Sequence, residues 1–496
     1  MSYAKAASAA VSLTLVAGAA LAPGAGAAPS PPRAPETVVA LIDTGINPYS
    51  PAFRDTSKLA RRHPSTYLPG YPKDAIALRL TLGVPYEEAV ERDEAVWKSV
   101  QTGKLYWVPG TRIVGAISFG AGGTSCPSPV EVPPVGAYLQ EQCPEHRILD
   151  DHGHGSMTAS RAAGAPSSLA PGSRIVAIEG LGARSVQWAA DQGWIDVQSN
   201  SWISLVPPPV PSAVTEAFSD AAARMLTLAA SGNGTAYLAG VAPTPTHLLS
   251  TAPPGVVLVG GHDNGKMTLW SGSPPHVVAD AYAGMTAIAR SVEEMRPDPI
   301  ACCTSAASPY AAGGAVALIA EARRLLGSGF TGVRDGAVAC GREGAVPSGP
   351  LADGIFTLEE LKDVFLHSAE ALPSEGRDDG DVHWAGDPRA PDHVQHGPGG
   401  NPFCAGCTTT PLPWKTLPEA ADAYALVGYG GINEHSVEAG LAVLRGDAEL
   451  PDRPAADAQY DADQQLRSVW FGQNDLADPG EPVVTCPGML TARPAG

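Results

Sequence analysis

The chain has 496 residues, of which 51 are Asp or Glu and 32 are Lys or Arg, so its formal net charge is −19 at pH 7. No basic run is long enough to follow a phosphate backbone, which argues against nucleic acid as a partner. Hydrophobic residues make up 44% of the chain, which excludes general disorder, and 55 Gly and 48 Pro predict many loops.

The first 27 residues have the layout of a secretory signal peptide. Lys5 precedes an apolar run over about residues 6–22, and small residues at 25–27 form a cleavage site. The run is short for a membrane anchor, and no later segment is apolar enough to span a bilayer. We therefore expect cleavage after Ala27, a secreted mature protein that is not attached to a membrane, and a short Pro-rich segment over 28–35.

Apolar runs alternate with helix-like stretches from residue 37 onward. The runs are short, mostly β-branched and end at a turn or a polar residue; they cover 37–46, 174–180, 194–202, 225–234 and 255–261. Stretches of helical pattern lie between them at 155–164 and 213–224. This alternation predicts an α/β fold around a parallel sheet, with ligands beyond the carboxyl ends of the strands.

The second half of the chain contains further helices and several irregular regions. An Ala- and Gly-rich helix is predicted over 303–326, and Thr357 with Glu360 forms a capping-box signature at the start of another, over 357–372. Regions that lack these patterns are predicted insertions; they lie near 54–110, 328–355 and 373–416. The chain over 446–496 is predicted to be a C-terminal tail with one helix, over 455–472.

Eight cysteines fit an oxidising compartment, where disulfides persist. Cys126 and Cys143 flank a Pro-rich loop and are the first pair that we expect, although the sequence leaves the connectivity open. Cys404 and Cys407 spell a CxxC, but the sequence lacks the second such pair that a zinc ribbon needs.

Cys302 and Cys303 are adjacent in the sequence. A bond between neighbouring cysteines is strained, so a distant partner such as Cys340 is favoured for this pair. Such a disulfide would brace the turn that precedes the Ala- and Gly-rich helix.

Four segments place one polar group where a strand ends or a helix begins. They carry Asp43 in LIDTGI, His154 in DDHGHGSMTAS, Asn233 in LAASGNG and Ser305 in CTSAASP. A Ser hydroxyl becomes a useful nucleophile only when an imidazole takes its proton and a carboxylate holds that imidazole. An Asn amide beside the backbone N–H of Ser305 would stabilise a developing oxyanion.

Each of these segments has another interpretation when taken alone. Asp43 also fits an ordinary turn, Ser305 fits a helix N-cap, and Asn233 begins a glycosylation sequon. The remaining alternative is a zinc site, with His152, His154 and Asp150 or Asp151 as its ligands. No distant third or fourth ligand has motif spacing, so we expect no metal at this site.

The order Asp, His, Asn, Ser, together with VALIDTGI, GHGSMTAS, AASGNG and TSAASPYAAGGAVALI, closely resembles the subtilisin-like serine proteases, or subtilases. The resemblance covers most of residues 36–444, insertions excepted. It implies a catalytic domain over 36–445 with a three-layer α/β fold, in which helices flank a mostly parallel sheet and long loops are inserted.

The resemblance also implies a role for each polar group. Asp43 orients the base, His154 is the general base and acid, Ser305 attacks the substrate, and Asn233 completes the oxyanion hole. The stretch over 196–204 resembles the strand that pairs with the substrate backbone, so substrate contacts are expected at Ser201, Trp202 and Ile203. The implied protein is a secreted, monomeric endopeptidase that cleaves polypeptides through an acyl-enzyme and needs no cofactor for the chemistry.

The sequence departs from the family pattern in three places. Cys303 stands where the family usually has glycine, and its side chain would crowd the scissile peptide. Asp43 follows Ala27 too closely for the prosegment that exported relatives commonly carry, so no pro-domain is expected. The long spacing between Asp43 and His154 predicts a disulfide-bearing excursion at the rim of the active site.

Two other functions remain open. A catalytically impaired relative would bind peptides in a strand-like mode without turnover, and an esterase would use the same triad. A sedolisin-like acid protease would need Glu at the position of His154. An imidazole base predicts activity that rises from roughly pH 6 to 8. The acidic stretch 376–384 is a possible structural calcium site by the resemblance, but it does not fit an EF-hand and a solvated loop is favoured.

Overall fold

The computed structural model describes residues 36–120, 147–150, 152–164, 168–204, 212–233, 249–263, 266–267, 271, 274–281, 286–287, 290–292, 303–371, 428–471 and 486. These residues belong to one compact unit, Ala34–Gly496. None of the helices that they form is long and apolar enough to cross a membrane. The expected signal peptide, Cys126, Cys143, Cys404, Cys407 and the stretch 376–384 lie outside the described residues.

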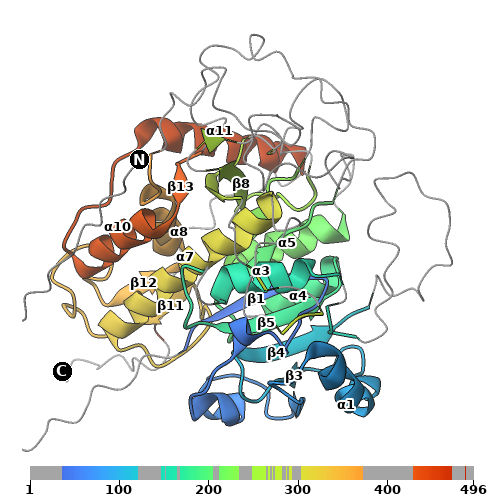
Figure 1. The fold of residues 1–496 in the computed structure, drawn as a ribbon. Helices are drawn as coiled ribbons and strands as arrows, with labels where there is room; N and C mark the ends of the chain where they lie inside the picture. Colours follow the sequence, from blue (N-terminus) through green and yellow to red (C-terminus); the bar gives the residue numbers. More distant parts are fainter. Residues whose placement is uncertain are drawn as a thin grey trace, which may run out of the picture. The chain divides into compact units, whose positions relative to one another are not determined.

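A mostly parallel sheet forms the centre of the fold (Figure 1). Its strands hydrogen-bond in the order β13-β10-β8-β7-β6-β1-β5-β4-β3-β2, and β9 pairs with β8. Among the described strands of this sheet, only the β3–β4 and β8–β9 pairs are antiparallel. The bounds are β1 Val38–Asp43, β2 Ile76–Ala77, β3 Tyr106–Trp107, β4 Ile113–Ser118, β5 Arg174–Glu179, β6 Val197–Asn200, β7 Leu226–Ala230, β8 Val257–Asp263, β9 Lys266–Met267, β10 Val277–Asp280 and β13 Gly431–Ile432.

Helices cover both faces of this sheet. One face packs against α3 (His154–Ala163) and α7 (Thr304–Leu326), behind which lie α8 (Leu358–His367) and α10 (Glu434–Arg445); the other packs against α4 (Ala183–Asp191) and α5 (Ala213–Arg224). Figure 1 shows α7 running through the middle of the fold, beside α3, toward the hairpin of β11 (Ala337–Cys340) and β12 (Ile355–Thr357). The expected three-layer α/β fold is confirmed.

The central strand β1 shows why this sheet is buried on both sides. All six of its residues are buried, and they alternate between two cores. Val39 and Leu41 pack with the α3 and α7 side, whereas Val38, Ala40 and Ile42 pack with the α4 and α5 side. A continuous apolar run is therefore required here, as in other parallel strands covered by helices.

The small residues of α3 and α7 let these helices approach closely. A Cβ atom on Gly313 of α7 would lie 2.7 Å from the carbonyl oxygen of Ala162 in α3, which is closer than such contacts allow. At the amino end of α8, Thr357 and Glu360 form the expected capping box. The Ala- and Gly-rich composition thus reflects tight packing between two central helices.

Several elements were not anticipated from the sequence. The stretch near 54–110 contains a helix, α1 (Tyr86–Lys98), and the strands β2 and β3, which extend the sheet at one edge. The strands β4 and β10 and the helix α4 were also missed. These stretches are short or lack a clean apolar period, so local pattern alone does not reveal them.

Cys340 forms a disulfide with Cys486. The expectation that Cys340 pairs with Cys302 or Cys303 is therefore wrong. Cys340 ends β11, which lies beyond the carboxyl end of α7, whereas Cys303 precedes the amino end of the same 23-residue helix. A helix of that length spans roughly 35 Å, too far for a disulfide.

The helix expected in the C-terminal region is α11 (Pro454–Trp470), and it is docked onto the fold by buried polar contacts. Arg467 is 0% exposed; it donates to Asp463 Oδ2 at 2.5 Å and to the carbonyl of Ala252 at 2.9 Å. Asp463 also lies 3.0 Å from Nε2 of the buried His276. Because Nδ1 of His276 accepts from the N–H of Leu258, the hydrogen of the neutral ring is on Nε2 and points to Asp463.

These contacts predict how α11 responds to mutation. Replacing Arg467 by methionine should lower the free energy of unfolding by about 3 kcal/mol, because the buried carboxylate of Asp463 loses a charged partner. Urea unfolding measures this change. Gln465→Ala, at an exposed position of the same helix, should change the free energy by less than about 0.5 kcal/mol. Equal effects of the two substitutions would show that α11 contributes little to stability.

Candidate active site

Asp43 and His154 meet at the carboxyl edge of the sheet. Asp43 is the last residue of β1 and is 3% exposed, and His154 is the first residue of α3. The Nδ1 atom of His154 lies 2.7 Å from Oδ1 of Asp43. Asp43 Oδ1 also accepts from the N–H of Thr44, and its Oδ2 accepts from the hydroxyl of Thr158 at 3.2 Å. The carboxylate is therefore fixed in place by the residue that follows β1 and by groups on α3.

Glycines allow β1 and α3 to come this close. A Cβ atom on Gly155 would lie 2.1 Å from the carbonyl oxygen of Gly45. Gly153, which precedes His154, has a φ of 100°, a conformation that residues with side chains seldom adopt. The Asp-Thr-Gly and Gly-His-Gly motifs thus follow from the close approach of the two elements.

Asp150 ties the turn before His154 to the turn after Asp43. Its Oδ1 accepts from the hydroxyl of Thr44 at 2.9 Å and from the N–H of Gly153 at 2.8 Å. Its Oδ2 accepts from the N–H and the hydroxyl of Ser156, at 2.7 and 2.6 Å. Asp150 is 0% exposed, so this network holds the amino end of α3 in a fixed position.

The neighbouring residue Ile148 is held in an unusual conformation. Its φ is 74°, which is rare for a β-branched residue. Its N–H donates to Oε2 of Glu179 at 2.6 Å, and its carbonyl accepts from the N–H of Ile46. Burial raises the pKa of Glu179, whose strand position is directly opposite Asp43. Backbone strain that its surroundings maintain is common beside functional sites.

The environment of His154 sets both its tautomer and its pKa. A carboxylate can only accept, so the hydrogen of the ring is on Nδ1, and Nε2 is left to accept a proton. Burial lowers the pKa of His154, but the charge of Asp43, the hydrogen bond to it and the charge of Asp150 together raise it above the ordinary value. The neighbouring His152 has a pKa lowered by burial.

Ser305 is the second residue of α7 and is 8% exposed. The preceding Cys303 has a φ of 77° and a ψ of −168°, a combination that is almost exclusive to glycine. This conformation explains why subtilisin-like proteases usually have glycine at the position that Cys303 occupies here. Cys303 is disulfide-bonded, and its partner lies outside the described residues.

Ser201 and Ser305 exchange hydrogen bonds. Pro309 lies inside α7 and has no N–H for the carbonyl of Ser305, four residues earlier. The hydroxyl of Ser201 donates to that carbonyl at 2.9 Å instead. In return, the hydroxyl of Ser305 donates to the carbonyl of Ser201 at 3.2 Å. In this structure the Ser305 hydroxyl therefore points to Ser201 rather than to His154.

Thr304 fixes the side-chain amide of Asn233. The N–H and the hydroxyl of Thr304 donate to Oδ1 of Asn233 at 2.9 and 2.6 Å. Because an N–H can only donate, the amide oxygen must face Thr304, and Nδ2 is directed elsewhere. Thr304 was not singled out in the sequence, although it lies beside Ser305 in the motif.

The helices that carry His154 and Ser305 touch each other directly. Met157 of α3 packs on Ala306 of α7. The buried guanidinium of Arg161 in α3 donates to the carbonyl of Asp280 at 3.0 Å and lies 4.1 Å from the ring centre of Tyr310 in α7. No sequence pattern indicated Arg161, because its contacts come from two other elements, β10 and α7.

The remaining residues expected at the site follow β6. The ring of Trp202 packs edge-on against Phe218 of α5, with 5.5 Å between the ring centres. Ile203 lies beside Gly232, which precedes Asn233. The structure thus joins Asp43 with His154, and Ser201 with Ser305. It places Ile203 next to the stretch that carries Asn233, and Trp202 against α5.

Asp150 and His154, two residues of the alternative zinc site, have other partners in this structure. Both carboxylate oxygens of Asp150 are occupied by hydrogen bonds, and His154 Nδ1 faces Asp43. No group of three or more His, Cys, Asp or Glu side chains that could hold a metal is found among the described residues, of which Asp151 is not one. The structure places a carboxylate–imidazole pair at a strand end and a serine at a helix start, which are the residue types that serine hydrolases use.

The chain belongs to the subtilase family, because the sequence model of that family matches residues 34–379. It is accordingly a serine-type endopeptidase, a hydrolase whose substrates are polypeptides. No curated protein matches the chain in a sequence search.

Solved structures of proteases resemble the chain at low identity. A mutant of the protease domain of PatA has 14% identity and a TM-score of 0.40, covering 84% of this chain and 98% of its own. The prenylagaramide maturation protease PagA has 14% identity and a TM-score of 0.37, covering 84% and 95%. A cold-adapted subtilisin-like serine proteinase has 16% identity and a TM-score of 0.33, covering 60% and 84%.

Proposed function

We propose that the protein hydrolyses peptide bonds through an acyl-enzyme on Ser305, with His154 as general base and acid and Asp43 as its orienting carboxylate. The observation that carries this proposal is the 2.7 Å contact between His154 Nδ1 and Asp43 Oδ1. It leaves Nε2 of His154 free to take the proton of a serine hydroxyl. The contact between Met157 and Ala306 brings the two helices together at this point.

The reaction begins when the Ser305 hydroxyl turns from the carbonyl of Ser201 toward His154. Oγ of Ser305 attacks the carbonyl carbon of the peptide, and Nε2 of His154 takes the hydroxyl proton. The tetrahedral intermediate carries an oxyanion, which accepts from Nδ2 of Asn233 and from the N–H of Ser305, one of the N–H groups at a helix start that have no partner within the helix. His154 then protonates the leaving amine. In the second half of the reaction, water attacks the acyl carbon and gives a proton to His154, which returns a proton to Oγ of Ser305 as the acid product leaves.

Thr304 supports this oxyanion site by holding the Asn233 amide. Thr304→Val removes one of the two hydrogen bonds to Oδ1. We expect kcat to fall by about tenfold with KM little changed, because a net hydrogen bond is worth about 1 kcal/mol. Steady-state kinetics on a chromogenic peptide measures the change. Thr304→Ser keeps the hydroxyl and should retain most of the activity; a loss as large as that of valine would contradict this role.

We propose that the substrate backbone lies along Ser201, Trp202 and Ile203, which follow the carboxyl end of β6. Export through residues 1–27, with cleavage after Ala27, would place the enzyme and its polypeptide substrates outside the cell. The proton transfers require no cofactor. The protein acts as a monomer. Calcium bound at 376–384 would contribute to stability and not to the reaction. The amino-terminal sequence of protein recovered from the culture medium tests the cleavage site.

A fluorophosphonate probe tests the proposed nucleophile in the full chain. We expect labelling at Ser305, located by peptide mapping, and its loss in Ser305→Ala and in His154→Ala. Circular dichroism checks that the variants are folded. Folded wild-type protein that is not labelled would contradict the proposal and favour the peptide-binding alternative, with the conformation of Cys303 as the first feature to test. Cleavage of esters without cleavage of amides would favour the esterase.

A further inference from the structure

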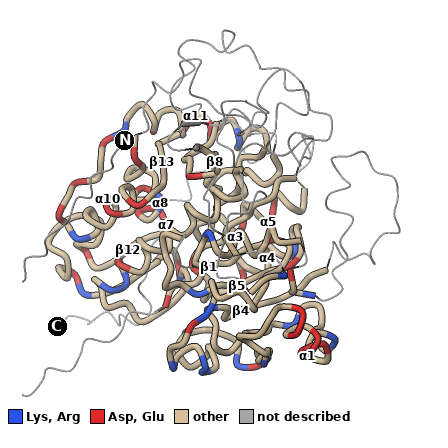
Figure 2. The backbone as a smooth tube through the Cα atoms, in the orientation of Figure 1, with Lys and Arg blue, Asp and Glu red and all other residues tan. Residues whose placement is uncertain are grey.

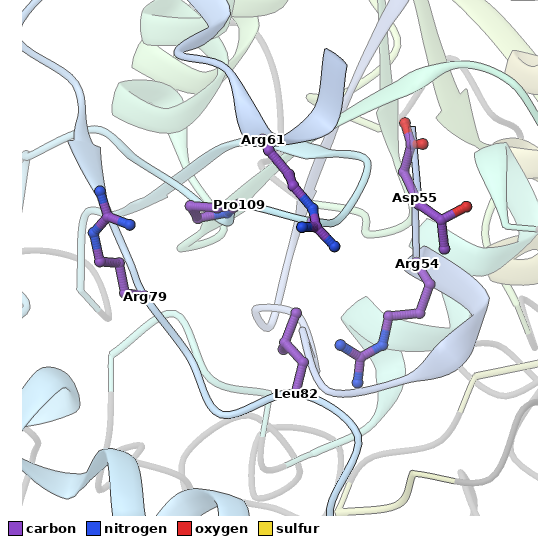
Figure 3. Close-up of a pocket in the computed structure, with 8 residues that line it drawn as sticks. Arg54, Asp55, Arg61, Arg79, Leu82 and Pro109 are labelled. Atoms are coloured by element: carbon purple, nitrogen blue, oxygen red, sulfur yellow. The ribbon is translucent and has the colours of Figure 1, made fainter. Parts of the chain in front are cut away.

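Three arginines gather around one pocket, far from the proposed active site. The pocket has a volume of about 410 Å³ and is lined by Arg54, Arg61, Arg79, Leu82 and Pro109, among others. Figure 3 shows the Arg54 and Arg61 side chains directed toward the same opening above Leu82, with Arg79 on its opposite side. Guanidinium groups therefore dominate the polar lining.

The arginines lie in a basic segment of an acidic protein. Residues 54–79 contain six Lys or Arg and two Asp, whereas the whole chain has a net charge of −19. Figure 2 shows Lys and Arg along the chain below β4 and Asp and Glu along the neighbouring α1. The overall field of the protein repels anions, so an anion would be attracted only by a local group of cations such as this one.

The positive charge in the pocket is not neutralised by the protein. Arg54, Arg61 and Arg79 form no ion pair with a carboxylate among the described residues. Arg54 donates to the carbonyl of Tyr49 at 2.9 Å, and burial lowers its pKa. Asp55 also lines the pocket, but its carboxylate is bound to Arg174 at 2.5 Å.

Main-chain hydrogen bonds hold the walls of the pocket in place. The N–H of Asp55 donates to the carbonyl of Gly110 at 3.0 Å, and the N–H of Gly110 donates to the carbonyl of Ala60 at 2.8 Å. Arg54 is bridged to Thr111 as in an antiparallel sheet. The arginines therefore extend from a fixed backbone, which lowers the entropic cost of binding a ligand.

The pocket lies at the amino ends of the parallel strands, whereas Asp43 lies at their carboxyl ends. Thr111 comes just before β4, and Arg174, the partner of Asp55, is the first residue of β5. Asp43 is the last residue of β1, which runs parallel to β5. Six residues of strand span roughly 20 Å, so a ligand in the pocket would not touch the proposed catalytic groups.

We propose that this pocket is a binding site for a multivalent oxyanion, a ligand with at least two negative charges on phosphate or carboxylate oxygens. Guanidinium groups bind such oxygens through paired hydrogen bonds, and several arginines around one cavity favour a ligand with more than one charge. Leu82 and Pro109 add an apolar wall for the body of the ligand. The site goes beyond the proposed function and does not depend on it.

Isothermal titration calorimetry on the full chain tests the site, at constant ionic strength because salt screens such interactions. The probes are inorganic pyrophosphate, citrate and a blocked tetraglutamate peptide. We expect at least one probe to bind with one-to-one stoichiometry, and Arg61→Gln and Arg79→Gln each to weaken that binding by about tenfold or more. Arg61 and Arg79 are exposed, so these variants should fold.

Arg62→Gln is the matched control, because Arg62 is adjacent and exposed but does not line the pocket. It should bind the probe as the wild type does. Binding of pyrophosphate or citrate alone would identify a small anion as the ligand, and binding of tetraglutamate would identify an acidic segment of a polypeptide. No binding of any probe, or equal weakening by Arg62→Gln and Arg61→Gln, would overturn the proposal.

Discussion

His154→Ala is expected to lower kcat/KM for a peptide substrate by about 10⁶-fold, a magnitude taken from subtilisin, where removing the base costs nearly as much as removing the whole triad. Without an imidazole, the hydroxyl of Ser305 keeps its proton, and the leaving amine has no acid. Hydrolysis of a chromogenic peptide, followed at high enzyme concentration, measures the loss.

His152→Ala provides the matched control for this prediction. Its ring centre lies 6.1 Å from that of His154, so both residues share much of the same environment. The ring nitrogen 2.7 Å from Asp43 Oδ1 belongs to His154, whereas Nδ1 of His152 accepts from the N–H of His154 at 3.3 Å. Replacement of His152 should therefore cost far less activity. A residual activity of His154→Ala within about 100-fold of the wild type would mean that another group removes the proton.

The pH dependence of the wild type follows from the same group. His154 is active as a base only when neutral, and its pKa is raised above 6.5 in the folded protein. kcat/KM should therefore rise with pH, with a midpoint above 6.5, and level off once His154 has lost its proton. A rate that peaks below pH 5 would contradict an imidazole base.

Asp43→Asn is expected to lower kcat/KM by about 10⁴-fold, as the corresponding change does in another serine protease. An amide can donate to Nδ1 of His154, which would move the ring hydrogen to Nε2 and leave no acceptor for the Ser305 proton. The lost negative charge should also shift the midpoint of the pH profile downward, because Asp43 is what raises the pKa of His154. Steady-state kinetics between pH 5 and 9 measures both effects.

Thr158→Ala separates the charge of Asp43 from its positioning. It removes the 3.2 Å hydrogen bond to Oδ2 but leaves the carboxylate and its contact with His154. We expect a loss in kcat/KM of no more than about tenfold and an unchanged midpoint of the pH profile, since a single hydrogen bond is worth about 1 kcal/mol.

A pH profile of Asp43→Asn identical to that of the wild type would show that Asp43 does not act on His154.

The acid stability of the protein should depend on the contacts of α11. Burial, the largest influence, lowers the pKa of His276, so the folded protein favours the neutral ring. Below pH 6.5 the unfolded chain binds a proton at His276 more readily than the folded protein does. The free energy of unfolding therefore falls as the pH drops below 6.5. Burial raises the pKa of Asp463, but its bonds with His276 and Arg467 outweigh this and lower it to about 2. Its contribution is lost at still lower pH.

Much of the fold is predictable because local sequence patterns indicate its strands and helices. The helix over 213–224 has the same bounds in the structure, and the capping box at Thr357 lies where the sequence predicts it. Asp43, His154 and Ser305 were identified because each interrupts an apolar run or opens a helix of small residues. Such signals are local, and a buried strand or a tightly packed helix leaves them in the order of its residues.

The features that the sequence did not predict depend on contacts between residues that are distant in the sequence. The sequence gives no sign that Asp150 ties two turns together, that Cys340 pairs with Cys486, or that α11 is held by a buried ion pair. Each of these contacts joins different elements; His276 and Asp463, for example, are 187 positions apart. Such pairs are chosen by packing, which no local propensity records.

By itself, the sequence determined the central strands β1 and β5 to β8, most of the helices that flank them and the chemical groups at their ends, because burial and close packing restrict which residues each position accepts. Only the tertiary structure decided where those groups point. It turned the Ser305 hydroxyl toward Ser201, directed the amide oxygen of Asn233 toward Thr304, and gathered three arginines around one pocket. Side-chain direction depends on partners from other elements, which meet only when the chain is folded.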